Sequence, residues 1–253
     1  MKKFLHAFLR EKPLFFSVLR PKEASLYQPY KPFKKPVLDV GCGDGFFAKL
    51  AFGKVDVGLD VGSSEMDEAK RWKVYGVITE YDGRKIPYKD GYFSTVVCNS
   101  TFEHIPNIQE VLPEVSRVTK KGGMLYFTVP TNIWPRYLLG NKILGKPYEN
   151  YFIAKSKHYN LWSLDQWKKK LAKLDFEVTE HVYYLDNPKI MWFFDTAHYM
   201  SISSLITKKL FDKWVMFPKK FDYLSGFESA LLHETKQEME KGPYMFIAAK
   251  KTS

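Results

Sequence analysis

The sequence lacks the features that mark several classes of protein. It contains only 2 cysteines in 253 residues, too few for a disulfide-bonded scaffold. No uninterrupted apolar run approaches the roughly 18 residues that a transmembrane helix requires, because charged or polar residues interrupt every candidate stretch. Its 15 glycines exclude a collagen repeat, and an apolar fraction of 45% excludes overall disorder. We therefore expect a globular protein, with one large elaborated domain rather than two independent ones.

The N-terminal segment does not fit a secretory signal peptide. After Lys2 and Lys3 the apolar stretch is interrupted by His6 and Arg10, and no small-residue cleavage site follows. We expect this segment to be retained and the protein to be cytoplasmic.

Positive charge and aromatic side chains are abundant but unevenly distributed. The formal net charge is +11, and 17% of the residues are aromatic. Residues 1–36 carry a net charge of +7 and residues 131–253 carry +6, whereas residues 37–130 carry −2. The basic, aromatic surface therefore comes from the two flanks and needs an explanation separate from that of the central segment.

The central segment alternates between strand and helix patterns. Short apolar runs typical of buried strands occur at 37–40, 55–60, 74–81, 93–98 and 123–130. Segments with helical spacing lie between these runs, at 46–51, 64–72 and 108–118. Ser63 or Ser64 is the expected cap of the second helix. A Lys-Lys-Gly stop signal at 120–122 follows the third helix. Buried strands that alternate with helices predict a parallel, doubly wound α/β sheet. In such a sheet, ligands bind beyond the carboxyl ends of the strands.

A glycine-rich turn follows the first predicted strand. Gly41, Gly43 and Gly45 allow the backbone to approach a ligand closely, since a Cβ atom there would obstruct it. Asp60 ends the second strand, near the offset from Asp39 at which a carboxylate can accept both ribose hydroxyls. Together these features predict a cofactor that contains a nucleoside.

The glycine spacing argues against two common nucleotide sites. A nicotinamide-binding turn would have its third glycine where Phe46 or Phe47 stands. No Gly-Lys-Ser/Thr sequence is present, which argues against hydrolysis of a nucleoside triphosphate.

Five segments, in order, resemble the motifs of class I S-adenosylmethionine-dependent methyltransferases of the small-molecule type. They are residues 37–45, 58–61, 81–93, 98–105 and 112–123. The resemblance is continuous over about residues 36–130. It implies a Rossmann-like, mostly parallel seven-stranded sheet with helices on both faces, and S-adenosylmethionine (SAM) as the cofactor.

The resemblance also assigns cofactor contacts residue by residue, all at predicted strand ends or turns. They are Asp39, Gly41 and Gly43 for the methionine portion with Cys42 in the same turn, Asp60 for the ribose hydroxyls, Val61 for the adenine face, Asp82 and the Gly83 backbone for the adenine edge, and Asn99 and Ser100 beneath the sulfonium. Carboxylates around the site suit a cofactor that carries a sulfonium and an ammonium cation.

Methyl transfer from a sulfonium is an in-line displacement that leaves S-adenosylhomocysteine (SAH). The main requirement is alignment of the reacting atoms in a site without water, and a general base matters when the acceptor is a hydroxyl. His104 is the candidate catalytic residue because it follows the strand that ends at the cofactor, and imidazole titrates near neutrality. The alternative is a supporting role for His104 at the start of a helix.

The other polar groups receive no functional role from the sequence. We expect the distal histidines, His158, His181, His198 and His233, to be surface or core residues. No spacing of cysteines and histidines indicates a metal site, so we expect none. Cys42 and Cys98 are expected to be free thiols.

The chain is expected to divide into four segments. They are an N-terminal basic helical cap at 1–36, a cofactor-binding core at 37–187 with an irregular, lid-like segment at 131–160, a helical insertion at 188–242, and the last strand of the core at 243–253. Within the core, a capping-box pattern at Ser163 starts a helix that runs to about Asp175, and a strand follows at 176–185.

The flanks leave the acceptor open between several classes. Apolar stripes edged by lysines, such as Phe4, Leu5, Phe8 and Leu9 beside Lys2, suit either a membrane interface or an ordinary core. We expect a small or lipid-linked hydrophobic acceptor, with peripheral membrane contact as a possibility. The alternatives are an RNA methyltransferase that uses the basic aromatic flanks and a non-catalytic methyltransferase-like binding protein. The fourth strand ends without the Asn/Asp-Pro-Pro-aromatic motif of base-amino methyltransferases.

Overall fold

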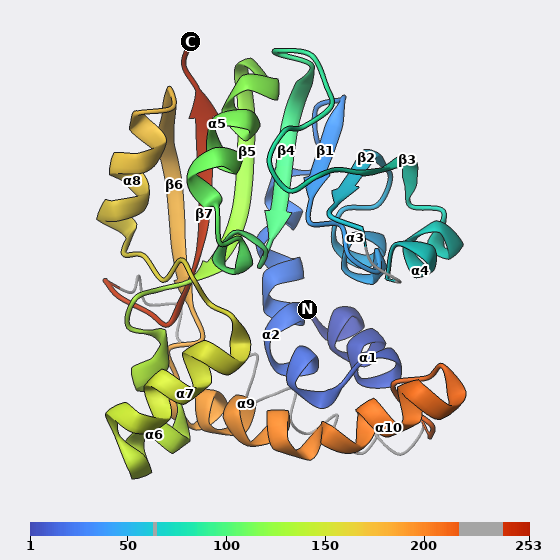
Figure 1. The fold of residues 1–253 in the computed structure, drawn as a ribbon, viewed down its shortest axis with the longest axis vertical. Coiled ribbons are helices and arrows are strands. Elements are labelled where there is room, and N and C mark those ends of the chain that lie inside the picture. Colours follow the sequence, from blue (N-terminus) through green and yellow to red (C-terminus); the bar gives the residue numbers. More distant parts are fainter. Residues whose placement is uncertain (63–64, 218–239) are drawn as a thin grey trace. The chain divides into compact units, whose positions relative to one another are not determined.

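The computed structural model describes residues 1–62, 65–217 and 240–253, and it contains two compact units (Figure 1). The sheet unit comprises Tyr27–Asn132, Lys157–Val182 and Tyr244–Ser253. The helical unit comprises Met1–Leu26, Ile133–Ser156 and Tyr183–Pro243. Within the described ranges, no helix has the length and apolar character needed to cross a membrane.

The seven strands form one sheet in the order β3-β2-β1-β4-β5-β7-β6. Their bounds are Val37–Val40 (β1), Val55–Asp60 (β2), Tyr75–Glu80 (β3), Phe93–Asn99 (β4), Thr119–Pro130 (β5), Phe176–Tyr184 (β6) and Tyr244–Lys251 (β7). β1 pairs in parallel with β2 on one side and with β4 on the other. β2 pairs in parallel with β3, and β4 pairs in parallel with β5. β7 runs antiparallel to β5. The predicted Rossmann-like seven-stranded sheet is confirmed.

The strand order changes direction between β1 and β4, because β2 and β3 extend the sheet one way and β5 the other. Both strands are almost fully buried, as their mainly apolar sequences predict. The carboxyl ends of β1 and β4 therefore define the switch point at which a doubly wound sheet binds its ligand.

Four α-helices and two short 3₁₀ helices complete the described part of the sheet unit. They are η1 (Gln28–Tyr30), α3 (Phe46–Ala51), α4 (Glu65–Trp72), η2 (Phe102–His104), α5 (Ile108–Val118) and α8 (Leu164–Ala172). α5 buries its apolar face and lies in front of β5 in the view of Figure 1. The capping box predicted at Ser163 is present, whereas the caps predicted at Ser63 and Ser64 lie outside the described residues.

The N-terminal segment divides between the two units. Tyr27 is fully buried in the sheet unit, where its hydroxyl donates to the Cys98 carbonyl at 3.2 Å and its ring contacts Phe52 and Phe246. The compact units therefore divide the chain at residue 26, ten residues before the end of the expected 1–36 cap.

The helical unit is built from three separate segments of the chain. Its elements are α1 (Lys2–Glu11), α2 (Leu14–Leu26), η3 (Trp134–Tyr137), α6 (Leu139–Leu144), α7 (Lys146–Ser156), α9 (Pro188–Met200) and α10 (Ile202–Phe211). The stripe of Phe4, Leu5, Phe8 and Leu9 is buried in this unit. For that stripe the ordinary core, rather than the membrane interface, is the correct alternative.

The prediction of irregular structure at 131–160 is wrong, because most of this segment is helical. Pro135 and Pro147 lie in the first turns of η3 and α7, where proline costs no helical hydrogen bond. Gly145, with φ +66°, joins α6 to α7. At Gly140 a Cβ atom would lie 2.2 Å from the ring of Tyr148, so this glycine permits close helix packing. The residues that suggested irregularity mark helix starts and junctions instead.

A smaller difference concerns the 120–122 stop signal. β5 begins at Thr119, so these residues are the start of the strand rather than a linker.

Candidate active site

The glycine-rich turn after β1 is held against the segment that follows β4. Gly41 has a φ of +78°, and a Cβ atom there would lie 2.3 Å from the side-chain atoms of Thr101. Its N–H donates to the Leu59 carbonyl at 2.8 Å, which also ties the turn to β2. Only glycine satisfies both the conformation and the approach. Thr101, which packs against this turn, is a candidate site residue that the sequence did not identify.

Asp60 is oriented by two backbone N–H groups. Its Oδ2 accepts from Gly43 at 2.7 Å and its Oδ1 accepts from Val61 at 2.8 Å. The structure therefore brings Gly43 and Asp60, two predicted cofactor residues, into direct contact. Val61 is 58% exposed beside them, so its side chain is accessible to a ligand.

Asp39 is a buried carboxyl group at the end of β1. The Tyr75 hydroxyl donates to its Oδ2 at 2.7 Å. Burial raises the pKa of Asp39 to about 7, because desolvation disfavours the charged form more than the Tyr75 hydrogen bond stabilises it. A cationic group placed beside Asp39 would favour its carboxylate form.

Tyr75 reaches Asp39 across β2 because Gly58 leaves room for its ring. A Cβ atom at Gly58 would lie 2.9 to 3.0 Å from three atoms of that ring. The sequence did not identify Tyr75. A glycine inside the β2 strand pattern was the available signal, since such glycines mark close approaches.

Asp82 and Gly83 form a turn, and Gly83 lies next to Val61. The Asp82 Oδ1 accepts from the N–H groups of Arg84 and Lys85 at 2.9 and 2.8 Å, and these bonds lower its pKa. Gly83 has φ +74°, and a Cβ atom there would lie 3.2 Å from the Val61 Cγ1. Val61 and Gly83, both predicted to contact adenine, are thus neighbours.

Asn99 and Ser100 are fixed at the end of β4 by the neighbouring strand. The Thr128 hydroxyl donates to the Asn99 Oδ1 at 2.9 Å, and the Ser100 N–H donates to the Thr128 carbonyl at 3.1 Å. Ser100 adopts a left-handed conformation with φ +47°. These two residues therefore form a rigid edge next to the Gly41 turn.

Both cysteines are buried free thiols, as predicted. Burial raises the pKa of the Cys42 thiol, with the nearby Asp39 and Asp60 carboxylates adding to the effect. The thiol is therefore neutral at ordinary pH, and Cys42 contributes to the turn through its backbone and small volume.

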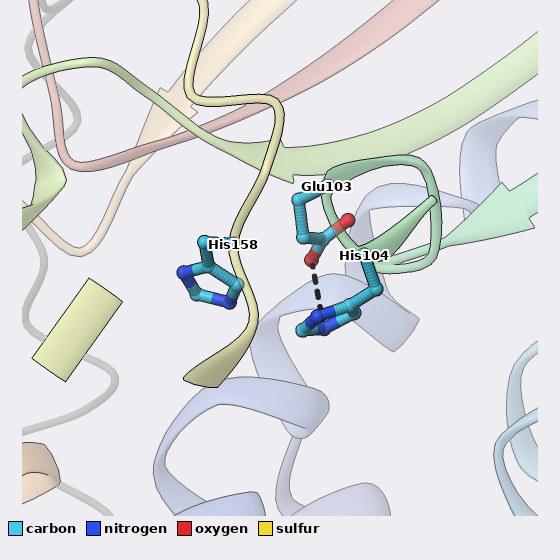
Figure 2. A group of neighbouring side chains, drawn as sticks. All are labelled: Glu103, His104 and His158. Atoms are coloured by element: carbon cyan, nitrogen blue, oxygen red, sulfur yellow. Dashed lines mark ion pairs between the residues drawn. The ribbon is translucent and has the colours of Figure 1, made fainter. Parts of the chain in front are cut away.

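His104 ends η2 and does not stand alone. Its side chain is 42% exposed, and its Nε2 lies 3.8 Å from Oε1 of the buried Glu103. The ring of His158 lies beside it, with 4.8 Å between the centroids (Figure 2). His158, which was expected to be a surface or core residue, is half-buried next to the candidate catalytic histidine, and its role stays a prediction. The catalytic role of His104 stays a prediction.

The other distal histidines lie away from this cluster. His181 is exposed on β6. His198 belongs to the helical unit, where it stacks on Phe15 with 4.1 Å between the ring centroids and burial lowers its pKa. His233 lies outside the described residues.

Comparisons with known proteins agree with this architecture. A family profile described as "Methyltransferase domain" matches residues 1–181. The ubiquinone biosynthesis O-methyltransferase of Shewanella halifaxensis (strain HAW-EB4) is 30% identical over 145 residues, which cover 51% of this chain and 61% of that protein. The chain thus matches about three fifths of that relative's length.

Solved structures show the same fold at low sequence identity. A SAM-dependent methyltransferase of Thermotoga maritima, described as a possible histamine N-methyltransferase, has a TM-score of 0.57 and 16% identity, covering 94% of this chain and 91% of its own. Geranyl diphosphate C-methyltransferase from Streptomyces coelicolor A3(2), in complex with Mg²⁺, geranyl diphosphate and SAH, has a TM-score of 0.59 and 15% identity, covering 92% of this chain and 79% of its own. Because the profile spans most of the chain, the chain belongs to the methyltransferase-domain family, and the structural similarity shows the Rossmann-like fold of class I SAM-dependent methyltransferases.

Proposed function

We propose that this protein transfers a methyl group from SAM to a small or lipid-linked hydrophobic acceptor. The observation that carries the proposal is the grouping of Asp39, the Gly41 turn and Asp60 at the switch point of the sheet. Membership of the methyltransferase-domain family supports the same reaction.

The residues at this edge fit the polar groups of SAM. Asp60 presents a carboxylate whose orientation is already set by two N–H donors, so it can accept from ribose hydroxyls without reorganisation. The buried Asp39 suits the ammonium group of the methionine portion, because a neighbouring cation offsets the cost of a buried negative charge. Val61 offers an exposed apolar side chain for a flat ring, and the Gly83 backbone lies beside it.

When bound, SAM supplies an electrophilic methyl group on a sulfonium. The chain's own contribution is orientation, because an in-line displacement requires the nucleophile, carbon and sulfur to be collinear. Asn99 and Ser100, anchored to Thr128, form a rigid floor for that alignment.

A hydrophobic acceptor agrees with the surface of the helical unit. α10 exposes Ile202, Leu205, Ile206 and Leu210, each at 54 to 66% of its full surface, at helical spacing. The exposed Lys209 lies within this helix. An exposed apolar helix face with basic residues suits a membrane interface, and we propose that the protein is cytoplasmic and makes peripheral membrane contact. The name of the Shewanella relative, which refers to ubiquinone biosynthesis, is consistent with a lipid-linked acceptor.

Calorimetric titration with SAM tests the cofactor part of this proposal. We expect saturable binding to the wild-type chain and an affinity roughly 100-fold lower for Asp60→Ala, which removes the charged acceptor of two hydrogen bonds. Asp67→Ala, at an exposed position on α4, is the matched control and should bind SAM as the wild type does. Absence of binding by the wild type would contradict the enzyme function and favour a non-catalytic binding protein.

A methyl-transfer screen tests the acceptor class. Extracts fractionated into lipid, small-molecule and RNA pools are incubated with the protein and labelled SAM, and we expect label in the lipid or small-molecule pool. Label in RNA alone would show that the RNA alternative is correct. Co-sedimentation with anionic vesicles at rising salt tests the membrane contact, and Leu205→Ser should weaken it.

A further inference from the structure

Glu103, His104 and His158 form a compact cluster at the carboxyl end of β4, here called the Glu103 cluster. One ligand atom from each residue lies within 4.8 Å of the other two. Glu103 is 2% exposed, whereas the His104 side chain is 42% exposed. Figure 2 shows Glu103 and His104 on the turn after β4 and His158 on the neighbouring segment. The cluster thus has a buried carboxylate and a side open to solvent.

The two segments that form the cluster are pinned together by hydrogen bonds. The N–H groups of Tyr159 and Asn160 donate to the Glu103 carbonyl at 2.8 and 3.2 Å. The Asn160 side-chain amide donates to the carbonyls of Phe102 and Ile105 at 2.8 and 2.7 Å. His158 is therefore held beside η2 by its sequence neighbours, and the three side chains are preorganised.

The hydrogen bond made by His104 determines which of its ring nitrogens faces Glu103. Its Nδ1 lies 3.3 Å from the Lys157 carbonyl, which can only accept, so the tautomer that is protonated at Nδ1 can donate to this carbonyl. In a neutral imidazole, Nε2 then has a lone pair, and this atom lies 3.8 Å from the Glu103 Oε1. That distance is too long for a hydrogen bond. Two electron-rich atoms that face each other in this way attract a cation between them.

From this geometry we propose that the Glu103 cluster binds one divalent transition-metal ion, with Zn²⁺ as the best fit and Mn²⁺ or Fe²⁺ as related ions. Imidazole nitrogen and carboxylate oxygen are the ligands these ions prefer, whereas Mg²⁺ prefers oxygen alone. Bonds of about 2.0–2.2 Å place two ligand atoms roughly 3–4 Å apart, so the 3.8 Å between the His104 Nε2 and the Glu103 Oε1 fits directly, and His158 would move slightly inward from within 4.8 Å. The Lys157 carbonyl would serve as the outer partner that fixes the His104 tautomer.

Three protein ligands leave a coordination position open on the exposed side of His104, as in catalytic metal sites. The consequence for the reaction rests on the proposed function. An acceptor hydroxyl bound there would lose its proton to water, and the metal-bound oxygen would then attack the methyl carbon. The C–S bond breaks with its electron pair going to sulfur, so the products are the methyl ether, SAH and one proton.

A free general base at His104 is the competing role. A base must exchange a proton at Nε2, the atom that faces Glu103, and it would not need His158. The metal site uses all three residues and explains why a carboxylate and a second imidazole lie at this position. It differs from the expectation, drawn from sequence spacing, that the chain has no metal site, and the titration described next tests which of the two is correct.

Cobalt binding tests the proposal without cofactor or acceptor. The protein is freed of metal with a chelator, dialysed and titrated with Co²⁺, whose visible absorption reports nitrogen and oxygen ligands, and then with Zn²⁺ by calorimetry. We expect one ion per chain. We expect Glu103→Gln and His158→Gln each to weaken binding by about 100-fold or more, since even outer-shell losses cost 10–100-fold. His181→Gln, at an exposed histidine of β6, is the matched control and should bind as the wild type does.

The outcomes separate the metal site from the proposed function. Absence of cobalt bands from the wild type, or equal affinity in His158→Gln and His181→Gln, would overturn the metal site whatever the SAM titration gives. Metal binding by a chain that does not bind SAM would sustain the site and refute the proposed function. If Glu103→Gln fails to fold, His158→Gln and the wild-type spectrum still decide.

Discussion

Each compact unit contains a buried aspartate, and the two are held in different ways. In the helical unit, both carboxylate oxygens of Asp195 have donors: the Gly140 N–H at 2.8 Å and the Tyr148 hydroxyl, which also contacts the Tyr199 hydroxyl. In the sheet unit, Asp39 accepts from Tyr75 on one oxygen, and burial raises its pKa to about 7. The first carboxylate is satisfied by the fold alone, whereas the second gains its full stabilisation only from a positive partner.

A second contrast lies within the helical unit and concerns two apolar stripes. The stripe on α1 is buried, whereas the stripe on α10 is exposed among the described residues. Taken together, the contrasts separate residues that the fold requires from residues that a ligand or surface would complete. A carboxylate whose hydrogen-bond donors are in place stabilises the chain, whereas we propose that the carboxylate at the strand end serves binding.

Asp195→Ala should have the largest effect on stability. It leaves the Gly140 N–H and the Tyr148 hydroxyl without the carboxylate that accepts from both. Loss of hydrogen bonds to a charged group should lower the free energy of unfolding by about 3 kcal/mol, as measured by chemical denaturation. SAM affinity, measured well below the unfolding transition, should not change. A fall in affinity without loss of stability would show that the comparison between the units is wrong.

Asp39→Asn should lower the affinity for SAM without lowering the stability of the chain. Because the charged form of Asp39 is disfavoured by burial, a neutral amide of the same shape should leave stability unchanged or higher. SAM affinity should fall about 10- to 100-fold, as expected for loss of a charge-assisted contact with an ammonium group. Calorimetric titration and denaturation of the same preparation provide both values.

The pH dependence of the free energy of unfolding tests whether the raised pKa of Asp39 is the cause. The folded-state pKa of Asp39 is raised above its unfolded value of about 3.9, so the folded state binds the proton more tightly. The contribution of Asp39 to wild-type stability is therefore complete below pH 4 and is lost as pH rises to about 7. Asp39→Asn should lack this decline between pH 4 and 7. Parallel stability curves for the two proteins would refute the assignment.

The sequence was sufficient for the parts of the site that depend on local pattern. Gly41, Gly43 and Asp60 could be located because strand periodicity places them at strand ends, where parallel strands converge. His158 could not, because its approach to Glu103 depends on how the 157–160 segment pairs with η2, which no local pattern encodes. Helices α6 and α7 were missed because Gly140 permits packing against Tyr148, a tertiary reason that outweighs glycine's low helix propensity.

Tyr75→Phe should have the smallest effect on stability, and it tests how the hydrogen bond to Asp39 influences that carboxyl group. It removes only the hydroxyl that donates to Asp39 and keeps the ring packed at Gly58. Loss of one hydrogen bond should lower the free energy of unfolding by about 1 kcal/mol at pH 8, where Asp39 is mainly charged. Because that bond lowers the pKa of Asp39, the variant should also shift the decline of stability to higher pH. An unchanged pH profile would mean that Tyr75 packs at the site without tuning the carboxylate, leaving burial alone to make Asp39 responsive to a cation.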